Sequence, residues 1–149
     1  MKIAIAADHG GFELKENLKK HYEKQGIILD DLGTYSTDSV DYPDIAEKMC
    51  KNILESSSDL GILICGTGIG MSMAANKHRG IRAACCSDTF SARLTRLHNN
   101  ANVLCLGARV LGTGLALDLV DQFVDAEFEG DRHIKRLSLI EDIENGKDL

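Results

Sequence analysis

The sequence predicts an α/β fold, in which a doubly wound sheet of five parallel strands is covered by helices on both faces. Short apolar runs with β-branched residues alternate along the chain with longer segments of helical period. The interiors of the short runs are almost entirely apolar, as in parallel strands that helices bury from both sides. With 149 residues, of which 44% are hydrophobic, we expect a single domain over residues 1–149.

Each strand is predicted from one of the short apolar runs. In chain order the five strands are Ile3–Ala7, Ile27–Leu32, Leu60–Cys65, Ile81–Cys85 and Val103–Leu106. We expect them in the flavodoxin-like order 2-1-3-4-5, one of the two common orders of doubly wound sheets.

Each helix is predicted from apolar residues that share roughly one side, as Phe12, Leu14, Leu18 and Tyr22 do in the first. The helices between and after the strands are Phe12–Tyr22, Asp44–Leu54, Gly70–Lys77, Thr89–Leu97 and Thr113–Val124. A C-terminal helix is expected over Asp131–Glu144, with Asp131 as its N-terminal cap.

Charge and cysteine content exclude several classes of function. The chain has 17 basic and 23 acidic residues, and this net charge of −6 argues against general binding to nucleic acid or to anionic membranes. The first apolar run ends at Asp8 after five residues, too few for a signal peptide or a membrane span. Five cysteines form no Cys-x-x-Cys pair, as expected of reduced thiols in a cytoplasmic protein.

Two polar, glycine-rich turns are expected to meet at the carboxyl ends of strands 1 and 3, where doubly wound sheets bind ligands. The first turn contains Asp8 and His9, and the second runs from Cys65 to Gly70. The second exposes main-chain N–H groups ahead of a helix and can hold a phosphate, an enediolate oxygen or the thiolate of Cys65. Met71 breaks both the dinucleotide pattern and the Cys-based phosphatase pattern. Cys65 can equally be a buried cysteine before a tight turn.

Three polar groups, the third of which is His98, have both a functional and a structural interpretation. Asp8 and His9 can bind a hydroxyl, or Asp8 can cap the first helix. Arg132 and Arg136 share a helix face and can hold a dianion between them, or be two solvated side chains.

His98 follows a helix at the amino edge of the sheet, a strand length from the predicted pocket. It is therefore either an ordinary helix C-terminal histidine or a side chain that a symmetric dimer brings into the neighbouring pocket. The pocket's need for a second acid favours the dimer.

The sequence resembles the ribose-5-phosphate isomerase B family over almost its whole length. The resemblance is carried by Asp8-His9-Gly10-Gly11, Asp41-Tyr42-Pro43, Gly61 to Gly70, Ala74-Ala75-Asn76-Lys77, His98-Asn99 and Arg132-His133. It implies a flavodoxin-like sheet, a homodimer or tetramer, and an enzyme without a cofactor. Some members of that family act on galactose 6-phosphate or allose 6-phosphate.

The resemblance also implies roles for individual residues. Cys65 is expected to be the catalytic base, Thr67 to pass a proton between the sugar oxygens, and His98 to open the sugar ring from the partner subunit. The expected substrate contacts are Asp8, His9, Tyr42, Gly66, Gly68, Ile69, Gly70, Asn99, Arg109, Arg132 and Arg136. One branch of the family has a glutamate base at the position of Met71, so this chain is expected to belong to the cysteine-base branch.

These observations predict an isomerase that interconverts ribose 5-phosphate and ribulose 5-phosphate through an enediolate. A six-carbon aldose 6-phosphate, of allose or galactose, is the alternative substrate. No metal is expected, because the predicted pocket offers mainly Asp8 as a ligand. The rival from another class is a flavodoxin-like module that binds a nucleotide or flavin, which leaves the arginines of the last helix unexplained.

Overall fold

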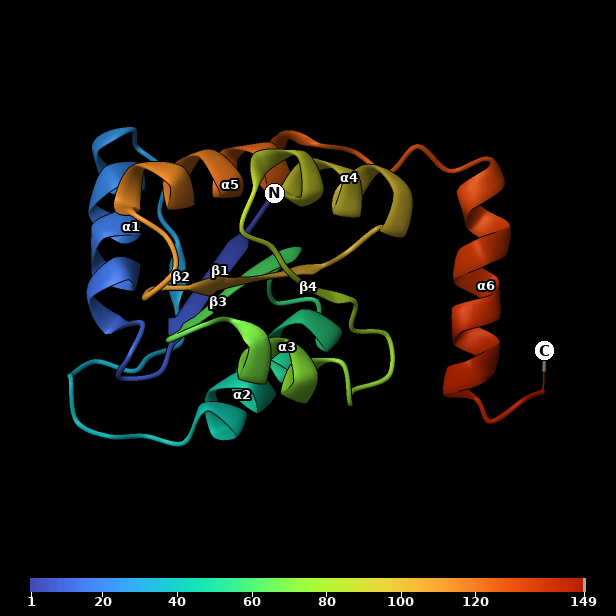
Figure 1. The fold of residues 1–149 in the computed structure, drawn as a ribbon, viewed down its shortest axis with the longest axis horizontal. Coiled ribbons are helices and arrows are strands. Elements are labelled where there is room, and N and C mark those ends of the chain that lie inside the picture. Colours follow the sequence, from blue (N-terminus) through green and yellow to red (C-terminus); the bar gives the residue numbers. More distant parts are fainter. Residues whose placement is uncertain (149) are drawn as a thin grey trace.

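The computed structural model describes residues 1–148 and contains five parallel strands with helices on both faces (Figure 1). The strands are β1 (Ile3–Ala7), β2 (Asp30–Asp31), β3 (Leu60–Cys65), β4 (Ala83–Cys85) and β5 (Val103–Gly107). The predicted architecture is confirmed. Within the described part of the chain, no helix is both long and apolar enough to cross a bilayer.

Six helices cover the sheet or extend from it. They are α1 (Phe12–Lys24), α2 (Tyr42–Leu54), α3 (Ile69–Ala75), α4 (Thr89–Asn99), α5 (Thr113–Asp125) and α6 (Arg132–Glu144). Buried residues of α1, α4 and α5 form one core on one face of the sheet, and those of α2 and α3 form a second core on the other. Since α1 and α4 connect strands in one direction across the sheet and α2 and α3 in the other, crossovers of a single hand place them on opposite faces.

The expected strand order was wrong at one edge, because the observed order is β2-β1-β3-β5-β4. All five residues of β5 are buried, whereas the three residues of β4 are partly or largely exposed. A fully apolar strand buries the most hydrophobic surface in a central position with helices on both faces. A short strand leaves fewer main-chain groups unpaired at the edge of the sheet. As a result Cys65 of β3 pairs with Gly107 of β5, so the residues that follow β5 lie beside the Cys65 turn.

Two local predictions also need correction. Only Asp30 and Asp31 of the expected second strand pair with β1. Asp131 does not cap α6: its φ of 46° is outside the extended region of an N-cap residue, and its side chain makes no capping hydrogen bond. The first turn is closed by main-chain bonds instead, including the one from His133 N–H to Gly130 O.

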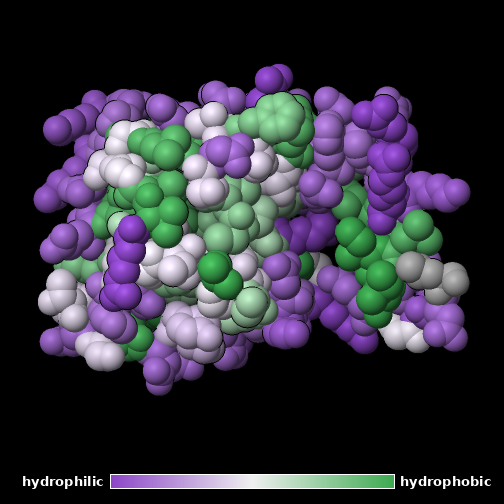
Figure 2. Space-filling model, in the orientation of Figure 1, coloured by the Kyte–Doolittle hydropathy of each residue, from purple (hydrophilic) through white to green (hydrophobic). Residues whose placement is uncertain are grey.

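Helix α6 stands away from the sheet, as Figure 1 shows. Only His133 and Leu137 of this helix are buried, while Ile134, Ile140 and Ile143 are 58%, 41% and 58% exposed. Figure 2 shows the resulting apolar patch on the helix surface. An open apolar patch on a helix remote from its own core is typical of a contact with another chain.

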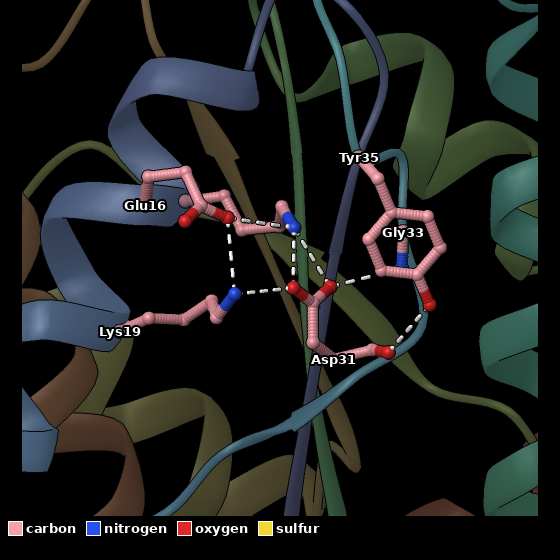
Figure 3. Close-up of polar contacts among 6 residues, drawn as sticks. Glu16, Lys19, Asp31, Gly33 and Tyr35 are labelled. Carbon is pink, nitrogen blue, oxygen red and sulfur yellow. Dashed lines mark hydrogen bonds and ion pairs between the residues drawn. The ribbon is translucent and has the colours of Figure 1, made fainter.

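A buried ion network fixes the segment that follows β2 (Figure 3). Lys15 is fully buried, and its Nζ donates to both carboxylate oxygens of Asp31 at 2.7 Å. Asp31 also accepts the N–H of Gly33 at 2.9 Å, and Tyr35 donates its hydroxyl to the Asp31 carbonyl. Burial raises the pKa of Asp31, but hydrogen bonds from Lys15 and Lys19 outweigh it and hold that pKa below its ordinary value. The network therefore anchors Gly33 and Tyr35, at the start of the segment that follows β2.

We expect Asp31→Asn to lower the free energy of unfolding by about 3 kcal/mol, because it leaves the buried charge of Lys15 without its main partner. Chemical denaturation at pH 7 measures this loss. The matched control is Asp38→Asn on the same segment, where an exposed carboxylate accepts the hydroxyl of Ser36 and, among the described residues, no other hydrogen bond. A loss no larger than that of the control would contradict the role given to Asp31.

Candidate active site

The carboxyl end of β3 places a cysteine beside main-chain donors. Cys65 closes the strand, and its side chain is buried with 6% of the residue exposed. Its Sγ accepts the N–H of Gly68 at 3.1 Å. A main-chain donor aimed at sulfur can stabilise negative charge that develops on it.

The turn after Cys65 requires glycine at two positions. Gly68 has a φ of +79°, and a Cβ there would lie 2.9 Å from Cys85 Sγ. A Cβ on Gly70 would lie 2.9 Å from the ring of Tyr42, which therefore packs directly on this residue. Thr67 and Ile69 are exposed on the outer side of the turn. The hydroxyl of Thr67 accepts the Ile69 N–H at 3.4 Å.

Asp8 and His9 lie at the neighbouring end of β1. Asp8 is 7% exposed, and its Oδ1 accepts the N–H groups of Gly10 and Gly11 at 2.9 and 3.1 Å. It therefore stabilises the turn that leads into α1. The prediction that Asp8 caps this helix was wrong, because Gly11 occupies the N-cap position and no side chain caps the helix. The Nδ1 atom of His9 accepts the Val40 N–H at 3.3 Å. This bond leaves Nε2 to carry the proton of the neutral ring, so that Nε2 is the nitrogen able to donate to a ligand.

Arg109 supplies positive charge at the same edge. Its guanidinium lies 3.4 Å from the position that a Cβ on Gly66 would occupy. One guanidinium nitrogen lies 3.8 Å from the position that a Cβ on Gly10 would occupy. The side chain is exposed and forms no salt bridge among the described residues. Together with His9 it lines a polar pocket of about 330 Å³. An open guanidinium beside backbone donors can bind an anion.

The other four expected site residues lie elsewhere in the chain. His98 and Asn99 end α4 at the amino edge of the sheet, as predicted for His98, and Arg132 and Arg136 lie on exposed turns of α6. The five residues of β5 separate the two edges by about 15 Å. The structure thus brings Asp8, His9, Tyr42, the Cys65–Gly70 turn and Arg109 together, and keeps His98, Asn99, Arg132 and Arg136 apart from them.

Two residues that sequence reasoning did not assign lie beside His98. Its ring stacks on that of His133, with centroids 4.3 Å apart and planes 9° from parallel. Glu129 Oε2 lies 3.6 Å from His98 Nε2 and 3.7 Å from His133 Nε2. His133 belongs to the Arg132-His133 motif but had no predicted role. No spacing rule connects Glu129 to His98, because strand β5, helix α5 and their connecting segments lie between them.

This group of two histidines and a glutamate is not arranged as a metal centre, although its ligand atoms lie within 4.8 Å of one another. Because the imidazole planes are nearly parallel, their lone pairs do not converge on one point. His133 Nε2 also accepts a hydrogen bond from Arg132 Nε at 3.3 Å, which occupies the lone pair that a metal needs.

Comparison with known proteins identifies close relatives along the whole chain. The sequence model of the family described as Ribose/Galactose Isomerase matches residues 3–140. Ribose-5-phosphate isomerase B of Escherichia coli is 46% identical over 143 residues, which are 96% of this chain and 96% of that protein.

Two solved structures extend the comparison to three dimensions. Ribose-5-phosphate isomerase B of Clostridium thermocellum has a TM-score of 0.95 at 49% identity, covering 98% of this chain and 99% of that one. The corresponding protein of Mycoplasma genitalium, solved with bound ribulose 5-phosphate, has a TM-score of 0.91 at 42% identity, covering 97% and 96%. The structural similarity therefore extends over almost the whole fold.

Proposed function

This chain belongs to the Ribose/Galactose Isomerase family, and we propose that it interconverts ribose 5-phosphate and ribulose 5-phosphate with Cys65 as the base. It is a sugar-phosphate aldose–ketose isomerase. The observation that carries the proposed base is the sulfur of Cys65 at the end of β3, which accepts the Gly68 N–H. The guanidinium of Arg109 lies next to Gly66 in the same turn.

The reaction needs a placed base and a stable site for the negative charge that develops on oxygen, because the hydrogen next to a sugar carbonyl is only weakly acidic. The Cys65 thiolate takes the proton from C2 of the open-chain aldose, and main-chain N–H groups of the Gly66–Gly70 turn stabilise the enediolate. The hydroxyl of Thr67 transfers a proton between O1 and O2. Cys65 then returns its proton to C1, so the ketose forms without net gain or loss of protons.

The complete site is proposed to form between two subunits. One edge of the sheet carries Cys65 together with Asp8, His9 and Tyr42. The other end of the same chain carries His98, Asn99, Arg132 and Arg136. A two-fold symmetric dimer can bring the Cys65 group of each chain opposite the His98 group of the other chain, which forms two identical sites. The exposed apolar residues of α6 support a contact of this kind.

The two arginines of α6 are proposed to bind the phosphate of the sugar delivered to the neighbouring pocket. They are one helical turn apart and exposed, and a dianion between them removes their mutual repulsion. A cytoplasmic location belongs to the same proposal, since all five cysteines are free thiols, as expected in a reducing compartment.

The substrate assignment is tested by comparing turnover of ribose 5-phosphate, allose 6-phosphate and galactose 6-phosphate. We expect kcat/KM to be at least about tenfold higher for the five-carbon substrate, because a pocket that fits one chain length loses binding energy with an extra carbon unit. Faster turnover of either six-carbon substrate would contradict the assignment to ribose 5-phosphate and leave the isomerase chemistry intact.

A further inference from the structure

We propose that Glu129 and His133 are positioning residues that hold His98 in the geometry needed to open the ring of the sugar. The inference rests on the proposed function, in which His98 serves the neighbouring pocket. Ring opening breaks the bond between C1 and the ring oxygen. The ring oxygen gains a proton and the C1 hydroxyl loses one, so an imidazole with a fixed orientation and a fixed proton is required.

His133 fixes the plane of the His98 ring. It is only 5% exposed, and its ring stacks on His98 at a centroid distance of 4.3 Å. Because a buried ring has little rotational freedom, the stacked partner is restricted to one plane. His133 also accepts the Nε–H of Arg132 at 3.3 Å, so a single buried ring contacts two of the residues proposed to enter the neighbouring site.

The hydrogen bond from Arg132 also decides the charge of His133. An Nε2 that accepts a hydrogen bond carries no proton, so the ring is neutral with its proton on Nδ1. Burial lowers the pKa of His133 below its ordinary value, and the nearby His98, Arg132 and Arg136 lower it further, against a smaller opposing effect of Glu129. The carboxylate of Glu129 therefore lies beside a neutral His133 on one side and beside His98 on the other.

Glu129 is itself held in place next to His98. Its main-chain N–H donates to the carbonyl of Leu97 at 3.0 Å, one residue before His98. Its Oε2 lies 3.6 Å from His98 Nε2. A carboxylate beside one imidazole nitrogen orients the ring, so Glu129 and His133 together hold His98 in one position for proton transfer to the ring oxygen.

The proposal is tested with Glu129→Gln and two assays that separate ring opening from proton transfer at carbon. The first assay is turnover of ribose 5-phosphate, which must be opened before reaction. The second is exchange of the C1 hydrogen of ribulose 5-phosphate in deuterium oxide, which needs no ring opening because the C5 oxygen of this ketose is esterified. We expect kcat/KM in the first assay to fall about tenfold to a hundredfold, and exchange to stay within about twofold of the unmodified protein.

The matched control is Glu127→Gln, which removes an exposed carboxylate two residues away and should change neither assay. A second variant, His133→Phe, keeps an aromatic ring against His98 and removes the acceptor for Arg132. It should raise KM for both substrates and retain turnover at saturation.

Normal turnover of ribose 5-phosphate by Glu129→Gln would overturn the proposal, and so would an equal loss in both assays, which marks a purely structural role. The proposed function fails by a different result, namely exchange that persists in Cys65→Ala.

Discussion

Replacing Cys65 with alanine is expected to lower kcat for ribose 5-phosphate by a factor of about 10² to 10⁴. The variant loses the only group proposed to take the proton from carbon, and Met71 nearby cannot accept a proton. The fold should persist, because Cys65 is a small side chain at the end of a strand whose other residues remain buried. Turnover under saturating substrate, together with circular dichroism of the purified variant, measures both parts of this expectation.

The control for Cys65→Ala is Cys50→Ala. Cys50 is a fully buried thiol in the same core, and burial raises its pKa to about 11, so it is not a thiolate at neutral pH. Its removal should reduce stability and leave turnover nearly unchanged. If Cys65→Ala isomerised ribose 5-phosphate at a near-normal rate, the base would have to be a different residue.

The fold was largely predictable from the sequence because its strongest signals are local. The buried runs Ile3–Ala7 and Leu60–Cys65 are strands with the predicted bounds. Strand order is not local: the apolar run that became β5 was correctly found, but its pairing with β3 depends on how much each strand buries in the finished sheet. Asp131 shows the same limit. Aspartate is a common N-cap residue, but the turn before α6 gives Asp131 a positive φ, and its side chain does not cap the helix.

The candidate site was predictable in part for the same reason. Glycine spacing and strand ends located the Cys65 turn and Asp8, and residue spacing placed His98 at the opposite edge. Arg109 carries no motif of its own and entered only through the family resemblance. Its place over Gly66 follows from the pairing of Cys65 with Gly107. Glu129 could not be found, because its contact with His98 exists only after α6 and the preceding segment have packed on α4.

Pairing Cys65→Ala with His98→Ala should restore activity that neither variant has alone. If each site takes Cys65 from one subunit and His98 from the other, a mixed pair has one site with both substitutions and one site with none. Co-expression with two different tags and purification over both isolates the mixed pairs. Their turnover of ribose 5-phosphate should be about half that of the unmodified dimer, because one of two symmetric sites is intact.

The matched control places the same two substitutions on one chain and leaves the other chain unmodified. A double variant with both Cys65→Ala and His98→Ala, paired with an unmodified subunit, leaves each shared site with one substitution. That pair should be nearly inactive on ribose 5-phosphate. If both residues instead served their own chain, the unmodified subunit would keep its site, and the two experiments would give the opposite result. Turnover by the double-variant pair near half of the unmodified level therefore rejects a site shared between subunits, whatever oligomer the protein forms.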